Sequence, residues 1–138
     1  FMPIVVNVVS KEEYAEWFAN KQAEAKEVND LMAQTFGMDD LMTRGKSVYE
    51  RSCLACHGAN GEGGVGTAIA GSTVATGDVS GHLDIGINGV PGTAMQAFGG
   101  QLNDVDMAAV ITYQRNAFGN NMGDLIQPID VYNHKKGQ

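Results

Sequence analysis

The pentapeptide Cys53-Leu-Ala-Cys-His57 constrains this chain more than any other feature. Two cysteines separated by two residues and followed at once by a histidine form the pattern to which c-type haem is covalently attached. Each thiol can add to one vinyl group of the porphyrin, and the histidine can place its imidazole under the iron. The pattern predicts one covalent haem c, attached through Cys53 and Cys56, with His57 as the proximal axial ligand.

Two other chemistries use a Cys-x-x-Cys pair. A structural zinc site needs four ligands, and Cys53 and Cys56 are the only cysteines in the chain. A thioredoxin-like redox pair belongs to a βαβ frame, which this sequence does not offer. Both alternatives are therefore weaker than haem attachment, and no structural disulfide is available.

The length of 138 residues and the 18 glycines fit one small domain with an additional arm. So many glycines predict long irregular loops, which a small protein can sustain when a buried haem fills its core. No apolar run approaches the length that a bilayer span needs. Covalent haem attachment implies assembly outside the bacterial cytoplasm or in an organelle compartment derived from that space.

The net charge of −7 is unevenly distributed. Residues 1–40 carry a net −5 from eight acidic residues and three lysines, whereas the remainder carries −2 from eight acidic and six basic residues. This balance argues against nucleic-acid binding. It would attract a basic electron donor through long-range steering, although a merely solvated acidic surface explains it equally well.

Residues 1–37 are predicted to form an arm. The β-branched residues 3–9 favour a strand, but the chain contains no partner strand, so its sheet would lie upstream. An unpaired strand of this kind exposes its edge and could mediate self-association. Ser10 and Glu13 fit a helix-starting capping box, and the aromatic residues that follow, headed by Trp17, predict a packed patch at the start of a helical linker.

Residues 38–118 are predicted to form an all-α haem domain, followed by an irregular tail over 119–138 with His134 in a solvated end. A first helix begins at Asp39-Asp40 and carries Gly45 and Tyr49 on one face. A glycine-rich loop follows over 58–81, with a short helix over 83–87. Asn103 caps the last helix, which ends near residue 116.

The second axial ligand must come from beyond the attachment motif. Methionine and histidine are the usual partners of a proximal histidine in electron-transfer haems. Met95 lies in a loop stiffened by Pro91 and Gly92, between the motif and the last helix, so it is the main candidate. His82 and Met122 remain as alternatives, although His82 is expected at a helix start or on the surface.

Several of these residues together resemble a class I cytochrome c domain. The resemblance rests on Gly45-Lys-Ser-Val-Tyr49, the haem motif, Val90-Pro-Gly-Thr-Ala-Met95 and Tyr113-Gln-Arg-Asn116. It implies three main helices around haem, with the first and last helices crossing at Gly45, Tyr49 and Tyr113. It also implies Met95 as the axial ligand opposite His57.

A narrower resemblance covers nearly the whole chain. Phe1-Met-Pro-Ile-Val-Val6 and Ser10-Lys-Glu-Glu-Tyr14 resemble the end of the copper-A domain of cytochrome c oxidase subunit II, and residues 120–131 resemble the tail of subunit II chains with a fused cytochrome c. The implied parent is a membrane-anchored caa3-type oxidase on the periplasmic side of the bacterial inner membrane. Met2 would then be a copper-A ligand in the full-length subunit only.

Two positions depart from that family. Thr67 stands where the family usually has a proline whose carbonyl orients the proximal histidine, and a threonine carbonyl can do the same. Gln96 follows the predicted axial methionine, where proline is often found. The departure at Gln96 predicts a more flexible ligand loop.

The main functional hypothesis is electron transfer without catalysis by this chain itself. A soluble cytochrome c would deliver an electron to the haem, which would pass it to the copper-A centre of the same oxidase subunit. The alternatives are a free-standing periplasmic carrier and a ligand-binding or catalytic haem protein. The latter requires that Met95 leave the iron open.

Overall fold

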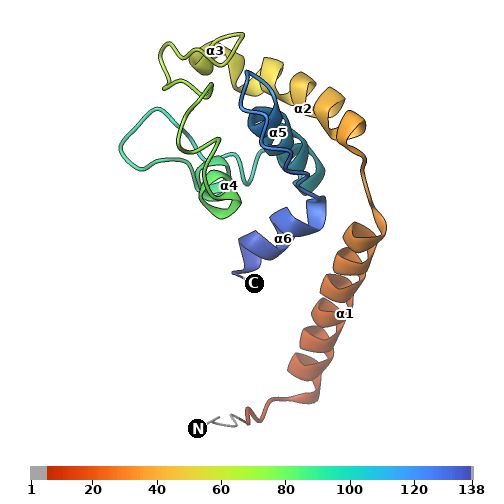
Figure 1. Ribbon diagram of the computed structural model, residues 1–138. Helices are drawn as coiled ribbons and strands as arrows, with labels where there is room; N and C mark the ends of the chain where they lie inside the picture. The colour runs from red at the N-terminus through yellow and green to blue at the C-terminus, as the bar shows by residue number, and fades with distance from the viewer. Residues whose placement is uncertain (1–5, 138) are drawn as a thin grey trace, which may run out of the picture. The chain divides into compact units, whose positions relative to one another are not determined.

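The computed structural model describes residues 6–137, which form six helices (Figure 1). The chain divides into two units, one ending at Ala33 and the other beginning at Gln34. Within residues 6–137 there is no strand, so the prediction of an all-α fold is confirmed for the described chain. None of these helices combines the length and apolar character needed to cross a membrane.

The predicted strand over residues 3–9 is wrong where the structure describes it. Residues 6–9 are exposed and have no regular structure. A strand gains its backbone hydrogen bonds from a neighbouring strand, and none is present in the described chain. Residues 3–5 and the predicted copper ligand Met2 lie outside the described residues.

Helix α1, Lys11–Ala33, begins at the predicted capping box. The Ser10 amide donates to Glu13 Oε2 over 2.8 Å, and the Glu13 amide donates to Ser10 Oγ over 3.2 Å. No side chain of this helix is buried. The rings of Tyr14 and Trp17 lie 5.7 Å apart, and each residue is about half exposed. The predicted aromatic patch therefore consists of contacts within the helix.

The second unit is organised by the crossing of α2, Met38–Ser52, with α5, Asp104–Asn116. Gly45 lies at this crossing, where an added Cβ would come 2.6 Å from Tyr113 Cβ. The rings of Tyr49 and Tyr113 lie 5.7 Å apart beside it. The predicted small-residue and aromatic contact is confirmed. As expected, α2 carries acidic residues in its first turn, and Asn103 caps α5 by accepting from the Asp106 amide at 2.8 Å.

Helices α3, Leu54–His57, and α4, Val79–Asn88, lie between the two crossing helices in sequence. The glycine-rich segment between them is a loop, as predicted. Helix α4 begins at Val79 rather than Leu83, so the short predicted helix gains one turn. It ends at Asn88 and is followed by the capping residue Gly89, whose φ of 69° is a backbone conformation that glycine adopts without strain.

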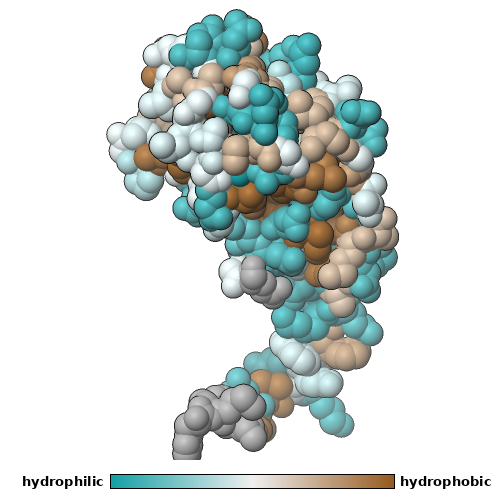
Figure 2. All heavy atoms as spheres, in the orientation of Figure 1, coloured by the Kyte–Doolittle hydropathy of each residue, from teal (hydrophilic) through white to brown (hydrophobic). Residues whose placement is uncertain are grey.

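The prediction of an irregular tail is wrong for Pro128–Lys136, which form helix α6. At the start of this helix the Gln127 amide donates to Asp130 Oδ2 at 2.8 Å, and the Gln127 side chain accepts from the Phe36 amide and donates to the Phe36 carbonyl, both at 3.0 Å. Val131 and Tyr132 are buried against the unit, where α6 packs on α4 and α5. Helix α6 therefore completes the core. On the surface of the protein, the face in Figure 2 shows apolar residues between hydrophilic ones.

Candidate haem site

A cavity of about 460 Å³ lies in the second unit, and the residues that line it fall between Ser52 and Gln114 in the sequence. The haem motif supplies Cys53, Cys56 and His57, and the loop over 90–96 supplies Met95. The remaining walls are mostly apolar. They come from the glycine-rich loop, α4, the segment between α4 and α5, and α5, and include Val65, Ile69, Ile85, Phe98, Leu102, Met107, Val110 and Ile111. The structure thus brings four of the predicted site residues to one cavity.

The imidazole of His57 is held in a defined orientation. Its Nδ1 lies 2.7 Å from the carbonyl oxygen of Thr67. Because a carbonyl only accepts, Nδ1 carries the hydrogen and Nε2 keeps a free lone pair, which is the tautomer that binds a metal through Nε2. Threonine thus supplies the carbonyl that was expected at this position.

The adjacent Gly66 forms a close cradle for the same ring. An added Cβ would come 2.9 Å from His57 Cε1 and 3.1 Å from Nδ1, closer than side-chain carbons normally approach. The loop is tied back to the motif by the Gly66 amide, which donates to the Cys56 carbonyl at 2.8 Å, and by the Gly63 amide, which donates to the His57 carbonyl at 2.8 Å. The glycine-rich segment is therefore a clamp around His57.

Tyr49 connects α2 to the end of the motif. Its hydroxyl donates to the Gly58 carbonyl over 2.7 Å, and its side chain is 1 % exposed. Burial raises the pKa of Tyr49 to about 12, with smaller contributions from Cys53 and Glu62. The phenol is therefore a neutral hydrogen-bond donor at physiological pH.

The two cysteines differ in their surroundings. Cys53 is half-buried and Cys56 is exposed, and both thiols are free. Burial, followed by the proximity of Cys56, raises the pKa of Cys53 to about 11. Cys53 is thus a neutral, partly buried thiol, which a thioether bond could replace without burying a charge.

Met95 is positioned by a tight turn. The Thr93 amide donates to the Val90 carbonyl at 3.2 Å, with Pro91 and Gly92 at the two central positions and a φ of 77° at Gly92. This sequence and geometry define a type II turn. The Val90 amide donates to the Met95 carbonyl at 2.9 Å and closes the loop. These bonds restrain the residues that precede Gln96, and the flexibility expected at Gln96 itself stays a prediction.

The alternative axial ligands lie in different environments. Met122 is 38 % exposed and is not among the residues that line the cavity. Met107 also lines the cavity, but it is 1 % exposed within α5, where packing is the usual role of a methionine. His82 also lines the cavity, in the first turn of α4. The expected helix-start position of His82 is correct, whereas the expected surface position is wrong because only 5 % of the residue is exposed.

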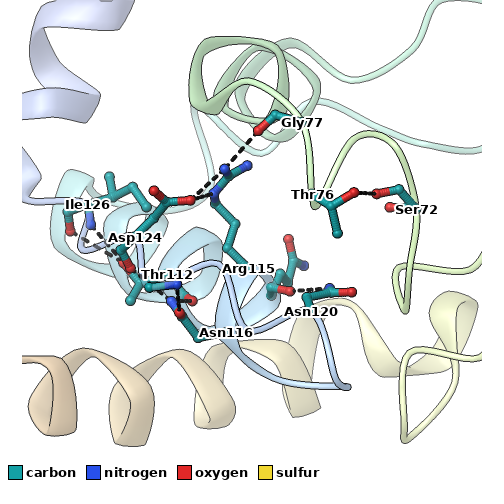
Figure 3. Close-up of polar contacts among 11 residues, drawn as sticks. Ser72, Thr76, Gly77, Thr112, Arg115, Asn116, Asn120, Asp124 and Ile126 are labelled. Atoms are coloured by element: carbon teal, nitrogen blue, oxygen red, sulfur yellow. Dashed lines mark hydrogen bonds and ion pairs between the residues drawn. The ribbon is translucent and has the colours of Figure 1, made fainter.

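Sequence reasoning missed a polar group between α4 and α5. His82 Nε2 lies 2.9 Å from Gln114 Oε1. Next to Gln114, the buried Arg115 donates through Nε to Asp124 Oδ2 at 2.6 Å and through Nη2 to the Gly77 carbonyl at 2.8 Å (Figure 3). The available signal was the polar pair Gln114-Arg115 in a helix that is otherwise buried, but sequence alone could not supply the partners.

These residues fit a haem. The cavity has apolar walls, an imidazole with a free Nε2 and a methionine on a restrained loop. Beside the imidazole lies Gly66, a position where any residue with a Cβ would crowd the ring. Within residues 6–137, no cluster of three or more His, Cys, Asp or Glu residues could hold a metal ion. A zinc site is therefore a poorer match to the described residues.

Comparison with known proteins also indicates a haem-binding domain. A family model described as cytochrome c oxidase, cbb3-type, subunit III, matches residues 40–113, which is more than half of the chain. The chain belongs to this cytochrome c family. Its second unit is a cytochrome c haem electron-transfer domain.

Two curated relatives are similar over part of their length. The chain is 30% identical to the gluconate 2-dehydrogenase cytochrome c subunit of Pantoea cypripedii, covering 80% of this chain and 28% of the relative. It is 32% identical to the dihydro-heme d1 dehydrogenase of Pseudomonas aeruginosa, covering 50% of this chain and 14% of the relative. The chain thus spans less than a third of either protein.

A solved structure agrees with these relatives. Dihydro-heme d1 dehydrogenase NirN in complex with DHE matches with a TM-score of 0.50 and 31% sequence identity, over 54% of this chain and 16% of that one. These three similarities are to oxidoreductases and their cytochrome subunits. They support the cytochrome c domain but not specifically the predicted caa3-type oxidase subunit II.

Proposed function

We propose that this cytochrome c domain carries one haem c, covalently attached through Cys53 and Cys56, with His57 and Met95 as axial ligands. The observation that carries the proposal is the placement of the motif and Met95 on one cavity, with the His57 tautomer set by Thr67. Bound haem would supply one-electron chemistry between ferric and ferrous iron. The chain itself performs no catalysis in this proposal.

The residues around the cavity serve a carrier rather than a catalyst. Thr67 and Gly66 hold the His57 ring, and the type II turn holds Met95. Two restrained ligands keep the same coordination in both oxidation states, so little rearrangement accompanies electron transfer. They also leave no open position for a substrate.

We further propose the parent protein to be a caa3-type oxidase subunit II on the periplasmic side of the bacterial inner membrane. A soluble cytochrome c would be the donor and the copper-A centre of the same subunit the acceptor. The support is the sequence of residues 1–14, with Met2 as a copper ligand in the full-length subunit, and the sequence of residues 120–131. A linker between the two centres would raise their effective concentration.

A second candidate is a cytochrome subunit that accepts electrons from a dehydrogenase. It is supported by the 30% identity to the gluconate 2-dehydrogenase cytochrome c subunit. The two candidates differ in what precedes Phe1. An oxidase subunit II requires a Cys-x-x-x-Cys copper motif just upstream, and a parent gene without one would exclude copper-A delivery.

The ligand assignment is tested by optical spectroscopy into the near infrared. The oxidised protein should show a methionine-to-iron charge-transfer band that is lost in Met95→Ala. Met122→Ala is the matched control, because Met122 does not line the cavity, and it should retain the band. A high-spin spectrum that shifts with cyanide in the unaltered protein would instead indicate an open iron and a ligand-binding or catalytic role.

The electron acceptor is tested by rapid mixing. The reduced domain should be oxidised by a soluble copper-A domain, and this rate should exceed the rate at which a substrate-reduced gluconate dehydrogenase reduces the oxidised domain. The reverse preference would favour the dehydrogenase-linked candidate.

A further inference from the structure

Two buried side-chain polar atoms among the described residues have no hydrogen-bond partner. They are Nδ1 of His82 and Nη1 of Arg115. An unpaired buried polar atom costs free energy comparable to a lost hydrogen bond. His82 lines the haem cavity, so its partner can be a group that occupies that cavity.

The His82 ring is fixed through its other nitrogen. Nε2 lies 2.9 Å from Gln114 Oε1, and this contact joins α4 to α5. Because both residues are buried in helices, the ring has little freedom to turn Nδ1 toward another protein group. Nδ1 is therefore an oriented polar atom without a partner in the described protein.

We propose that His82 Nδ1 donates a hydrogen bond to a propionate carboxylate of the haem, so that His82 is a positioning residue for the cofactor. Because Nε2 already donates to Gln114 Oε1, this contact requires the imidazolium form of His82, with the second proton on Nδ1 facing the carboxylate. This inference rests on the proposed haem. A haem presents an apolar ring edge to the cavity walls, and its polar groups are the iron and two propionates. Since His57 and Met95 are assigned to the iron, a propionate is the group left to pair with His82.

The surrounding charge favours an anion at this position. Arg115 is 2 % exposed, and its charge acts on His82, although its ion pair with Asp124 offsets part of that effect. Burial first, and then Arg115, lower the pKa of His82 to about 4 in the protein alone, against a raising contribution from Gln114. A nearby carboxylate would oppose the burial effect by stabilising a proton on Nδ1.

The test uses substitutions that separate the two ring nitrogens. Asparagine places its amide nitrogen at the same number of bonds from Cα as Nδ1, whereas the glutamine amide nitrogen corresponds to Nε2. His82→Asn should therefore preserve the propionate contact, and His82→Gln and His82→Leu should remove it. His134→Gln is the matched control, because His134 lies on α6 outside the haem cavity.

The readout is the propionate bending band in the resonance Raman spectrum of the reduced protein. This band should shift in His82→Gln and His82→Leu, and it should stay at the wild-type position in His82→Asn and His134→Gln. In parallel, nitrogen-15 NMR of the wild type should show a hydrogen-bonded Nδ1 for His82. A band that stays unchanged in His82→Gln would overturn the inference and leave a buried water as the partner.

The two levels of the proposal fail in distinguishable ways. Failure of every variant, and of the wild type, to carry haem would contradict the proposed function. Normal haem attachment and a normal Met95 charge-transfer band, combined with an unchanged propionate band in His82→Gln, would contradict only the role of His82. If His82→Leu does not fold, the comparison of His82→Asn with His82→Gln still shows whether Nδ1 contacts a propionate.

Discussion

At the scale of single residues, the haem-binding role of His57 depends on groups that touch its ring without touching a metal. The Thr67 carbonyl fixes the tautomer, and Gly66 leaves the space that the ring occupies. Neither contact needs a proline, which explains how the chain can depart from the related pattern at Thr67. The clamp around His57 thus consists of backbone groups and of the space left by the absence of a Cβ at Gly66.

Replacing Gly66 with alanine tests this clamp. The new Cβ would lie 2.9 Å from His57 Cε1, so the ring must move or the loop must open. Overpacking of this kind costs roughly 1–3 kcal/mol, and we expect a loss of that size in the free energy of unfolding by urea. Gly100→Ala is the control, because an added Cβ there meets nothing within 4 Å. Equal stability of the two variants would contradict the clamp.

The raised pKa of Tyr49 predicts that the free energy of unfolding decreases at alkaline pH. Its folded-state pKa is raised from 10.0 to about 12, so the folded state holds a proton that the unfolded state loses. The contribution is fully present below pH 10 and is lost as pH rises through 12. We expect a decline of roughly 2–3 kcal/mol in the free energy of unfolding over this range.

Tyr49→Phe isolates that contribution. The variant should lose most of the alkaline slope in urea unfolding, at a cost of about 1 kcal/mol at neutral pH for the hydrogen bond to Gly58. Burial also raises the pKa of Tyr113, so a smaller slope should remain. An unchanged slope would show that another group is responsible.

At the scale of elements, the crossing of α2 and α5 depends on close backbone approach. Gly45→Ala would place Cβ against the Ala109 carbonyl and 2.6 Å from Tyr113 Cβ, both on α5. We expect the variant to lose at least about 1–3 kcal/mol of unfolding free energy. Gly81→Ala, on the exposed part of α4 with open space around it, should gain about 0.4–1 kcal/mol. Urea titrations of both variants would check the pair.

The segment leading into α6 offers a second matched pair. Leu125 and Ile126 are neighbours, but Leu125 is 42 % exposed whereas Ile126 is 3 % exposed. Ile126→Ala should lower the free energy of unfolding by roughly 2–5 kcal/mol because it leaves a cavity. Leu125→Ala should change it much less. Similar small effects from both substitutions would mean that the segment does not belong to the core.

The same elements show what sequence can supply. The capping box at Ser10, the cap at Asn103 and the stop at Gly89 were predictable because each depends on residues within a few positions. The Gly45 crossing was predictable through family resemblance. Helix α6 was missed because its anchor joins Gln127 to Phe36, residues that lie 91 positions apart.

The candidate site divides in the same way. The motif and the Met95 turn have local signatures, so both could be predicted. The pairing of His82 with Gln114 spans 32 positions and has no local pattern. The predicted strand failed over residues 6–9 because composition favours a strand without providing its partner.

At the scale of the whole molecule, much of the net negative charge lies in the first unit, whereas the buried core lies in the second. Helix α1 contains six acidic residues and three lysines, a net −3, but none of its side chains is buried. The core residues lie in the unit that begins at Gln34. The first unit can therefore change encounter with a charged partner while contributing little to the stability of the haem domain.

A chain beginning at Gln34 would separate these two effects. Its free energy of unfolding should match that of the full chain within about 0.5 kcal/mol, because the removed helix buries no side chain. At low salt it should react more slowly than the full chain with a basic reduced cytochrome c, because its net charge is −4 and that of the full chain is −7. Raising the salt from about 0.01 M to about 0.1 M shortens the Debye length from ~30 Å to ~10 Å, so the full chain should slow more than the shortened one. Stopped-flow rates with equal salt dependence in both chains would show that the acidic arm does not steer the donor.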